Sequence, residues 1–331
     1  MNTTYPFFSV IIPLYNKEDY ISRAVSSVLS QTYQNFEIIV INDGSTDQGL
    51  DTVQKISDPR ISVITTKNRG ASAARNLGIK CSQGEIIAFL DADDQWLPEY
   101  LLEITTLVNC FPEAKVYATA VYQNNGNRLT HRHIDKYYRK NWKGLLKPKD
   151  IFYRGVPFNS SSVSIDRSFV QSIDGFDEKM KYGEDINMWM RLSLLVPIAY
   201  SSKYLAEVFI NTQNRSNYEI IDLPRYFLIE KSLKEAENSS ANLTQFSTKT
   251  ITEITKTQDD FRFIDFINEI GQKRPKQIRG GIFLSTTKIS SFVKRLSQNS
   301  ILSAFEKFTY MARLVVWIID YSLNKNRKKE I

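Results

Sequence analysis

The sequence predicts an α/β fold in which a mostly parallel central sheet is flanked by helices. Short apolar runs alternate with helical segments along residues 7–122, and this order is typical of βαβ units. Several of the apolar runs are continuous, as in buried strands. With 331 residues, 42% of them hydrophobic, the chain is long enough for two domains, or for one large domain with an appendage.

Five apolar runs are the expected strands: residues 7–14, 36–41, 61–65, 85–90 and 115–122. Between the first two, residues 18–31 carry apolar side chains at i, i+3, i+4, i+7 and i+8, starting at Ile21. This spacing predicts an amphipathic helix. Small residues favour a second helix over 70–80, and Pro98 suits the first turn of a third, over 98–109.

The later part of the chain is less regular. Residues 123–182 are polar, aromatic and rich in turn residues, and they predict no definite order of elements. A further helix is expected over 185–195, because Glu184 and Asp185 would place negative charge at its N-terminus. Beyond about residue 212 the pattern becomes helical and basic.

Three carboxylates follow the fourth apolar run within four positions: Asp91, Asp93 and Asp94. Neighbouring acids repel one another and resist desolvation, and a bound divalent cation offsets both of these energetic costs. Mg²⁺ or Mn²⁺ takes oxygen ligands and is commonly held by one or two carboxylates together with a substrate's phosphates. Ligands of open α/β sheets bind at the carboxyl ends of strands, so the sequence predicts a metal–diphosphate site here.

Two common phosphate-binding devices are absent from the sequence. No Gly-x-Gly-x-x-Gly follows the first expected strand, which ends in Pro13-Leu14-Tyr15-Asn16, and no Walker A lysine loop occurs. Phosphates would therefore be held through a metal at the acids after the fourth strand.

An ordered set of motifs resembles a family 2 glycosyltransferase with the GT-A fold. The motifs are Val10–Asn16 with its Pro-Leu-Tyr-Asn end, Asn42-Asp43-Gly-Ser-Thr-Asp47, Asn68–Asn76, Asp91-Ala92-Asp93-Asp94 and Gly183-Glu184-Asp185. The resemblance covers about residues 6–212. It implies a nucleotide-sugar donor, usually linked to UDP, a divalent metal, and inversion at the anomeric carbon. One position departs from the pattern, since Asn42 stands where the family often has an aspartate.

The resemblance also implies roles for individual residues. Asp185 matches the catalytic base and Asp93 the metal ligand, with Mn²⁺ or Mg²⁺ as cofactor. The implied contacts to the nucleotide-sugar are Pro13, Tyr15, Asp43, Arg75, Asp91 and Ala92, and secondary candidates for the site are Glu184, Asn16 and Trp189. Tyr15 would pack beside the nucleobase, Asp43 would hydrogen-bond it, and Asp91 would contact the ribose or sugar.

Several of these residues also admit a plain structural interpretation. Asp43 could simply shape a tight turn without binding a ligand, and Asp94 is expected to be a local cap. Arg75 could approach the diphosphate or simply pair with Asp91. Trp189 is more typical of a core than of an acceptor platform.

The predicted organisation has three parts. Residues 1–122 form the nucleotide-sugar half of the GT-A domain, residues 123–212 the acceptor half, and residues 213–331 a helical, basic C-terminal region. The predicted reaction transfers a sugar to a hydroxyl of a glycan, and the expected acceptor is lipid-linked, as in surface polysaccharide synthesis. Two alternatives stay open: a non-catalytic module that binds nucleotide-sugars or glycans, and a sugar nucleotidyltransferase.

Charge is unevenly distributed. Residues 271–331 contain 13 Lys and Arg against three acids, whereas the rest of the chain is slightly acidic. A possible amphipathic helix over 301–323, followed by basic residues, suits an anionic membrane surface, although packing on the catalytic domain or homo-oligomerisation would also use its apolar face. No nucleic-acid-binding motif is present.

The cellular setting expected from the sequence is the cytoplasm, at the inner face of the cell membrane. The two cysteines are too few for a disulfide framework. The N-terminus lacks the basic segment of a signal peptide, and no apolar run is long enough to span a bilayer.

Overall fold

A computed structural model describes residues 3–126, 129–131, 138–147, 150–151, 156–173, 175–180 and 183–212. Contacts within the chain divide it into two compact units, residues 1–223 with 228–254 and residues 224–227 with 255–331. All the described residues belong to the first unit. The predicted C-terminal region, 213–331, lies outside the described residues, so its helix and its membrane contact stay predictions.

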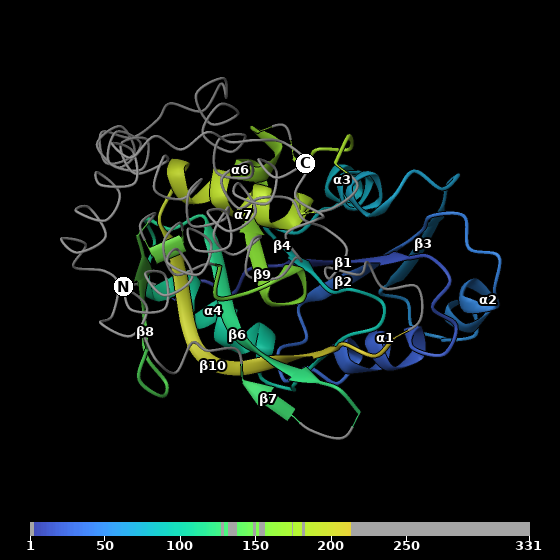
Figure 1. Ribbon diagram of the computed structural model, residues 1–331, viewed down its shortest axis with the longest axis horizontal. Coiled ribbons are helices and arrows are strands. Elements are labelled where there is room, and N and C mark those ends of the chain that lie inside the picture. The colour runs from blue at the N-terminus through green and yellow to red at the C-terminus, as the bar shows by residue number, and fades with distance from the viewer. Residues whose placement is uncertain are drawn as a thin grey trace, which may run out of the picture. The chain divides into compact units, whose positions relative to one another are not determined.

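Within the described residues, ten strands form one sheet in the order β3-β2-β1-β4-β9-β6-β10-β5, with β7 paired to β6 and β8 to β10 (Figure 1). The strands are β1 (Phe8–Leu14), β2 (Phe36–Asn42), β3 (Ile61–Thr65), β4 (Ile86–Phe89), β5 (Gln95–Trp96), β6 (Val116–Asn124), β7 (Leu129–His131), β8 (Lys143–Leu146), β9 (Val163–Asp166) and β10 (Ile198–Phe209).

The two halves of the sheet differ in strand direction. The strands β3, β2, β1 and β4 are all parallel, as the alternating pattern predicts. Strand β9 is antiparallel to both of its neighbours, β4 and β6. On the other side of β6, β10 is parallel to it over nine pairs, with two irregularities in register. The sheet is therefore a mixed one.

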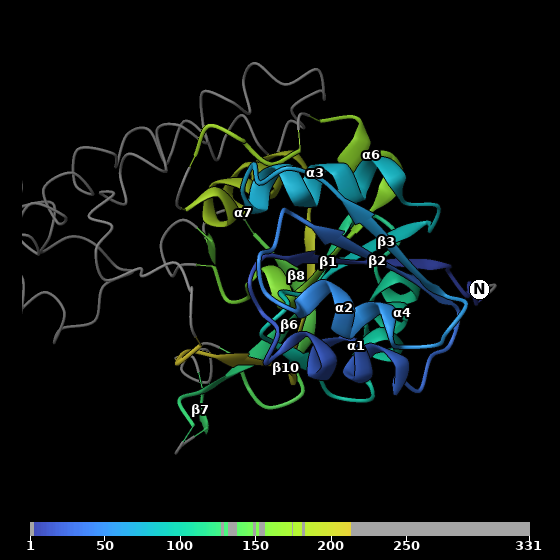
Figure 2. The same ribbon diagram turned by 90° about the vertical axis from the view of Figure 1, so that its right-hand side faces the viewer.

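Helices cover both faces of the sheet, and Figure 2 shows the resulting three layers. One face carries α3 (Ala71–Cys81), α6 (Arg167–Gln171) and α7 (Glu184–Leu195), and the other carries α1 (Ile21–Leu29), α2 (Gly49–Gln54) and α4 (Tyr100–Cys110). A short 3-10 turn, η2 (Ser160–Ser162), precedes β9. Helix α3 approaches β1 closely, because a Cβ added at Gly78 would lie only 2.4 Å from the side chain of Ile11.

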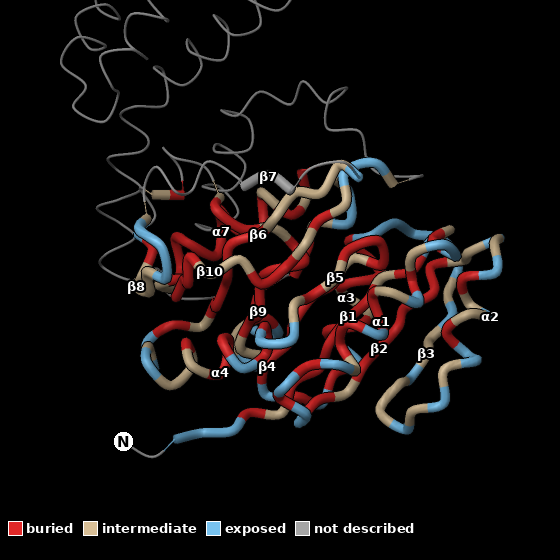
Figure 3. The backbone as a smooth tube through the Cα atoms, turned by 90° about the horizontal axis from the view of Figure 1, so that it is seen from below, coloured by how far each residue is buried: buried red, intermediate tan, exposed pale blue. Residues whose placement is uncertain are grey.

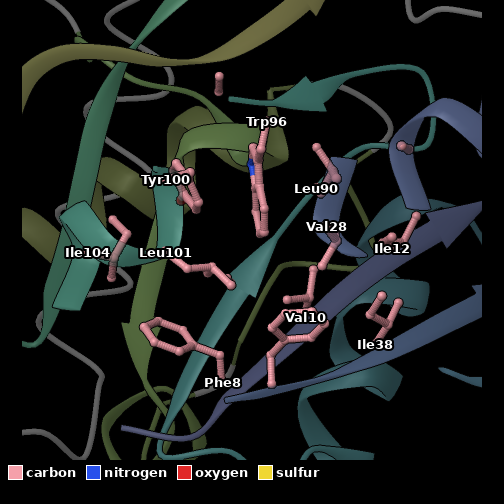
Figure 4. Close-up of a cluster of buried hydrophobic side chains, with 14 of the residues drawn as sticks. Phe8, Val10, Ile12, Val28, Ile38, Leu90, Trp96, Tyr100, Leu101 and Ile104 are labelled. Atoms are coloured by element: carbon pink, nitrogen blue, oxygen red, sulfur yellow. The ribbon is translucent and has the colours of Figure 1, made fainter. Parts of the chain in front are cut away.

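The core lies along the central strands (Figure 3). Every residue of β1 except Pro13 is buried, and so is all of β4, whereas the edge strand β3 is only partly covered. Figure 4 shows how side chains from β1, α1 and α4 meet in one apolar cluster. In this cluster Trp96 stacks on Tyr100 with 4.1 Å between ring centroids, so it is a core residue.

Sequence patterns located the N-terminal half of the fold. All five predicted strands and the four predicted helices are present, with ends shifted by at most three residues. The sequence did not reveal β9, β10 or the short elements between β6 and α7. Near the centre of the sheet, β9 has only four residues and alternates apolar with polar ones, and β10 contains the polar residues 201–203 where its register shifts. Neither shows the apolar run on which strand prediction depends.

Candidate active site

The loops that follow β1 and β2 are neighbours because the strands are paired as far as Leu14 and Asn42. Asn16 links the loops. Its side-chain oxygen accepts the backbone N–H of Thr46 at 2.8 Å, and its own N–H donates to the hydroxyl of Ser45 at 3.2 Å. Asn16 therefore has a structural role here, holding its backbone at φ +50°. Beside it, the side chain of Tyr15 is exposed, available to a flat ligand.

Asp43 is buried and joins the end of β2 to the start of α3. Its two carboxylate oxygens accept the backbone N–H groups of Arg69 at 2.9 Å and Gly70 at 2.8 Å. Gly70 is the N-cap of α3. The carboxylate thus satisfies donors at the N-terminal end of this helix segment. A carboxylate has about four acceptor positions, so this support leaves capacity for a ligand donor.

Arg75 connects three separate parts of the chain. Its guanidinium, buried on α3, contacts Asp91 after β4 at 2.8 Å and Glu184 at the start of α7 at 3.2 Å. Burial alone would lower the pKa of Arg75, but the charges of Asp91 and Glu184 outweigh it and raise that pKa. The structure thus shows the pair with Asp91, one of the two interpretations left open for Arg75, and it adds Glu184 as a second partner. The Nε of Arg75 is buried with no protein partner.

The same guanidinium faces the N-terminus of α7. Gly183, the residue before this helix, adopts the left-handed conformation at φ +71°. Glu184 and Asp185 follow in the first turn, and Asp185 is buried, with its Oδ1 accepting the N–H of Ile186 at 2.7 Å. Burial and the negative charge of Asp185 raise the pKa of Glu184 against the opposing effect of Arg75. Asp185 therefore lies in the same charged group as Asp91.

Asp93 lies in a second charged group, whose other members are Lys17, which follows β1, and Arg23 of α1. The ammonium of Lys17 contacts Oδ2 of Asp93 at 2.7 Å, and the hydroxyl of Thr212 donates to the same oxygen at 2.6 Å. Arg23 of α1 donates to the backbone carbonyl of Asp93 at 2.6 Å, and its guanidinium stacks on the ring of Phe209. Lys17 and Arg23 thus bring two positive charges to one aspartate.

This arrangement suits a cation at Asp93. The lysine ammonium is a stand-in for such an ion, since it shows that the carboxylate accepts a positive charge at short range. The hydroxyl of Thr212 donates to the same carboxylate oxygen, so it would have to turn before its own oxygen could bind Mg²⁺ or Mn²⁺, which prefer such hard donors. Among the residues that the structure describes, no group of three or more His, Cys, Asp or Glu side chains is placed to hold a metal ion. A metal here would have Asp93 as its protein carboxylate and would need further oxygens from a substrate.

Asp94 and Ser161 stabilise the turn between these two groups. The hydroxyl of Ser161 donates to Oδ2 of Asp94 at 2.5 Å and accepts the N–H of Asp91 at 3.1 Å. The other oxygen of Asp94 accepts the N–H of Phe209 at 3.1 Å. Asp94 therefore has a structural role, but instead of the expected local cap it holds two segments that are remote in the sequence. Sequence reasoning missed Ser161, whose only signal is its place in the polar run 159–162.

Three remaining candidates have little contact with solvent. Ala92 is buried within the acidic turn, and Pro13 is half-buried in β1. Trp189 is fully buried and packs edge-to-face on Phe176 with 5.6 Å between ring centroids. A ring with no exposed surface cannot serve as an acceptor platform, so Trp189 belongs to the core.

Fold and site together define an α/β domain with a mixed sheet and with two acid–cation groups beyond the carboxyl ends of β1 and β4. Residues 9–171 match the sequence model of the family described as glycosyl transferase family 2. This part of the chain belongs to that family, and the protein thus carries a family 2 glycosyltransferase domain.

The curated relatives include several glycosyltransferases. An uncharacterized glycosyltransferase of Haemophilus influenzae is 34% identical over 200 residues, which cover 57% of this chain and 61% of that protein. One of Rickettsia bellii is 34% identical over 209 residues, covering 62% and 29%. The chondroitin synthase of Pasteurella multocida is 27% identical, covering 98% and 33%. The chain therefore spans less than two thirds of the length of each of these relatives.

Among solved structures, S. aureus TarS 1–349 in complex with UDP-GlcNAc is similar, with a TM-score of 0.61 and 19% sequence identity. The similarity covers 88% of this chain and 80% of that one. It confirms the GT-A-type fold that the motifs imply.

The Arg75 group generates a prediction about stability. Replacing Arg75 with Met would leave Asp91 and Glu184 without their shared counter-charge, and breaking a buried ion pair in this way typically costs about 3–5 kcal/mol. Arg75→Met should therefore lower the free energy of unfolding by about that amount in urea titrations, and Arg75→Lys by less. Arg60→Met serves as the control, because Arg60 pairs with Asp58 nearer the surface. Equal losses in the two methionine variants would contradict this account.

Proposed function

We propose that the protein is an inverting glycosyltransferase that moves a sugar from a nucleotide-diphosphate donor, UDP-linked, to a hydroxyl group of a glycan. The observation that carries this proposal is the convergence of Asp91, Arg75, Glu184 and Asp185 from three different elements at one end of the sheet. The family match and the similarity to a protein whose structure holds UDP-GlcNAc support it.

The donor would lie along the carboxyl ends of β1, β2 and β4. Tyr15 offers an exposed ring for the nucleobase, and Asp43 has carboxylate lone pairs beyond those used by Arg69 and Gly70. Asp91 is partly exposed even though it pairs with Arg75, so it can accept hydrogen bonds from the ribose or sugar. Asp93 would hold Mn²⁺ or Mg²⁺, which when bound would neutralise the diphosphate.

Asp185 is the proposed general base. The acceptor hydroxyl attacks the anomeric carbon, and the bond from that carbon to the diphosphate oxygen breaks with the electron pair leaving on the nucleotide diphosphate. The hydroxyl proton passes to the Asp185 carboxylate. Glu184 and Arg75 position the start of α7 and keep the neighbouring charges compensated. Attack from the opposite face inverts the anomeric centre, and no covalent enzyme intermediate is formed.

Donor identity can be tested by thermal unfolding. The melting temperature should rise with one class of nucleotide-sugar in a panel of UDP-, GDP- and dTDP-sugars, and more so with Mn²⁺ than with EDTA. The expected stabilisation grows with the logarithm of ligand concentration over Kd and reaches about 2.7 kcal/mol at a hundred times Kd. The matching nucleoside without phosphates is the control. If no nucleotide stabilises the protein, the proposed donor site is wrong.

The base assignment predicts a split between turnover and binding. Asp185→Asn keeps the oxygen that accepts the N–H of Ile186, so α7 should begin unchanged. Turnover should fall at least about a hundredfold, the range attributed to general-base catalysis, whereas donor affinity should change little. Asp51→Asn, an exposed acid in the first turn of α2, is the matched control. Unchanged turnover in Asp185→Asn would contradict the base assignment, whereas absence of turnover in the wild-type protein would favour a non-catalytic binding module.

The acceptor is proposed to be a lipid-linked glycan at the inner face of the membrane, as in surface polysaccharide synthesis. Among the described residues no helix could cross a bilayer, and the excess of basic residues in 271–331 is the feature that would hold the protein to anionic lipid.

Vesicle sedimentation tests this attachment. The protein should sediment with vesicles containing phosphatidylglycerol and not with neutral phosphatidylcholine vesicles. Replacing Lys325, Arg327, Lys328 and Lys329 with Gln should weaken binding by about 1 kcal/mol per residue at low salt. Equal sedimentation with neutral vesicles, or none with either kind, would contradict membrane attachment through charge.

A further inference from the structure

Lys17 is a charged residue that the proposed mechanism does not use. It follows Asn16 directly, at the end of β1, and its side chain is mostly buried, as is that of its partner Asp93. The ammonium lies 2.7 Å from Oδ2 of Asp93 and 5.8 Å from the ring centre of Tyr20. A lysine thus lies at the carboxylate that is assigned to the divalent cation.

Lys17 and a metal ion cannot both occupy this oxygen. An ammonium and a divalent cation repel strongly at such short range, and the more so at a buried site where solvent screens little. The hydroxyl of Thr212 also contacts Oδ2, so this side of the carboxylate is already crowded. Binding of a metal at Asp93 therefore requires that the Lys17 ammonium move.

The backbone at Lys17 is fixed, so the movement would be confined to its side chain. Asn16, just before it, is hydrogen-bonded to Ser45 and Thr46. The carbonyl of Lys17 itself accepts the N–H groups of Tyr20 and Ile21 at the start of α1. A lysine ammonium on a four-carbon stem can reach a new partner without any change in the fold.

We propose that Lys17 is a ligand of the donor diphosphate and exchanges places with the divalent cation at Asp93. Without donor, Lys17 neutralises Asp93. When the metal–nucleotide complex binds, the metal takes the carboxylate, and the released ammonium contacts a phosphate oxygen, a partner for which lysine is well suited. The inference rests on the proposed function, because it names a further contact of the same donor site.

The exchange has a consequence for metal binding that does not involve activity. In the absence of nucleotide, Lys17 competes with the metal, so Lys17→Met should bind Mn²⁺ about tenfold or more tightly than the wild-type protein. The electron paramagnetic resonance signal of free Mn²⁺ measures this directly. Adding Asp93→Asn to Lys17→Met should abolish the gain. Lys55→Met, at an exposed lysine after α2, is the matched control and should resemble wild type.

The second arm measures nucleotide affinity by calorimetry with UDP, in EDTA and in Mn²⁺. In Mn²⁺, Lys17→Met should lose about ten- to a hundredfold in UDP affinity, the size of a charge-assisted hydrogen bond, and Lys17→Arg should recover part of it. In EDTA the loss should be smaller, because without a metal Lys17 stays paired with Asp93. Circular dichroism melts of each variant confirm folding. If Lys17→Met binds Mn²⁺ like wild type, or UDP like wild type, the exchange is wrong and the contact is a structural ion pair. If the wild-type protein itself binds no UDP, the proposed function fails, and this inference fails with it.

Discussion

The buried guanidinium of Arg75 is the interaction on which the site depends. Asp91 follows β4, and Glu184 and Asp185 begin α7, so acids from two distant parts of the chain meet around one buried guanidinium. Without a positive charge between them, their repulsion and desolvation would oppose the packing of α7 against this end of the sheet. Arg75 removes that opposition and fixes the distance between strand and helix.

Helix α3, which carries Arg75, is itself held by an acid. The carboxylate of Asp43 accepts two backbone N–H groups at the start of the helix, and the close contact of Gly78 with Ile11 fixes the rest of the helix on β1. The end of β2, the helix α3, the end of β4 and the start of α7 therefore form one connected chain of contacts. Asp43 and Asp185 are therefore joined by this series of contacts, although 142 positions separate them in the sequence.

The sequence predicted the half of the fold whose strands are continuous apolar runs, and it predicted the acids at their ends. It did not predict β9, because this strand contains Ser164, a buried polar residue. The hydroxyl of Ser164 forms a hydrogen bond with Tyr100 instead of being replaced by an apolar side chain. Nor did it assign a role to Lys17 or Ser161, whose partners lie 76 and 67–70 positions away. Local patterns identify chemical types at strand ends, whereas the pairing of a cation with a particular acid depends on the packing of the whole domain.

Asn42 shows why a departure from the family pattern can leave the site intact. Its side chain is buried beside Asp43, its oxygen accepts the N–H of Ser45 at 3.0 Å, and its amide donates toward the hydroxyl of Thr65. An aspartate could accept the first hydrogen bond equally well, but it would add a second buried charge next to Asp43. The amide keeps the turn in shape and leaves Asp43 as the acid that supports α3. The substitution therefore changes the charge at the end of β2 without disturbing the contacts that connect this strand to Arg75 and the start of α7.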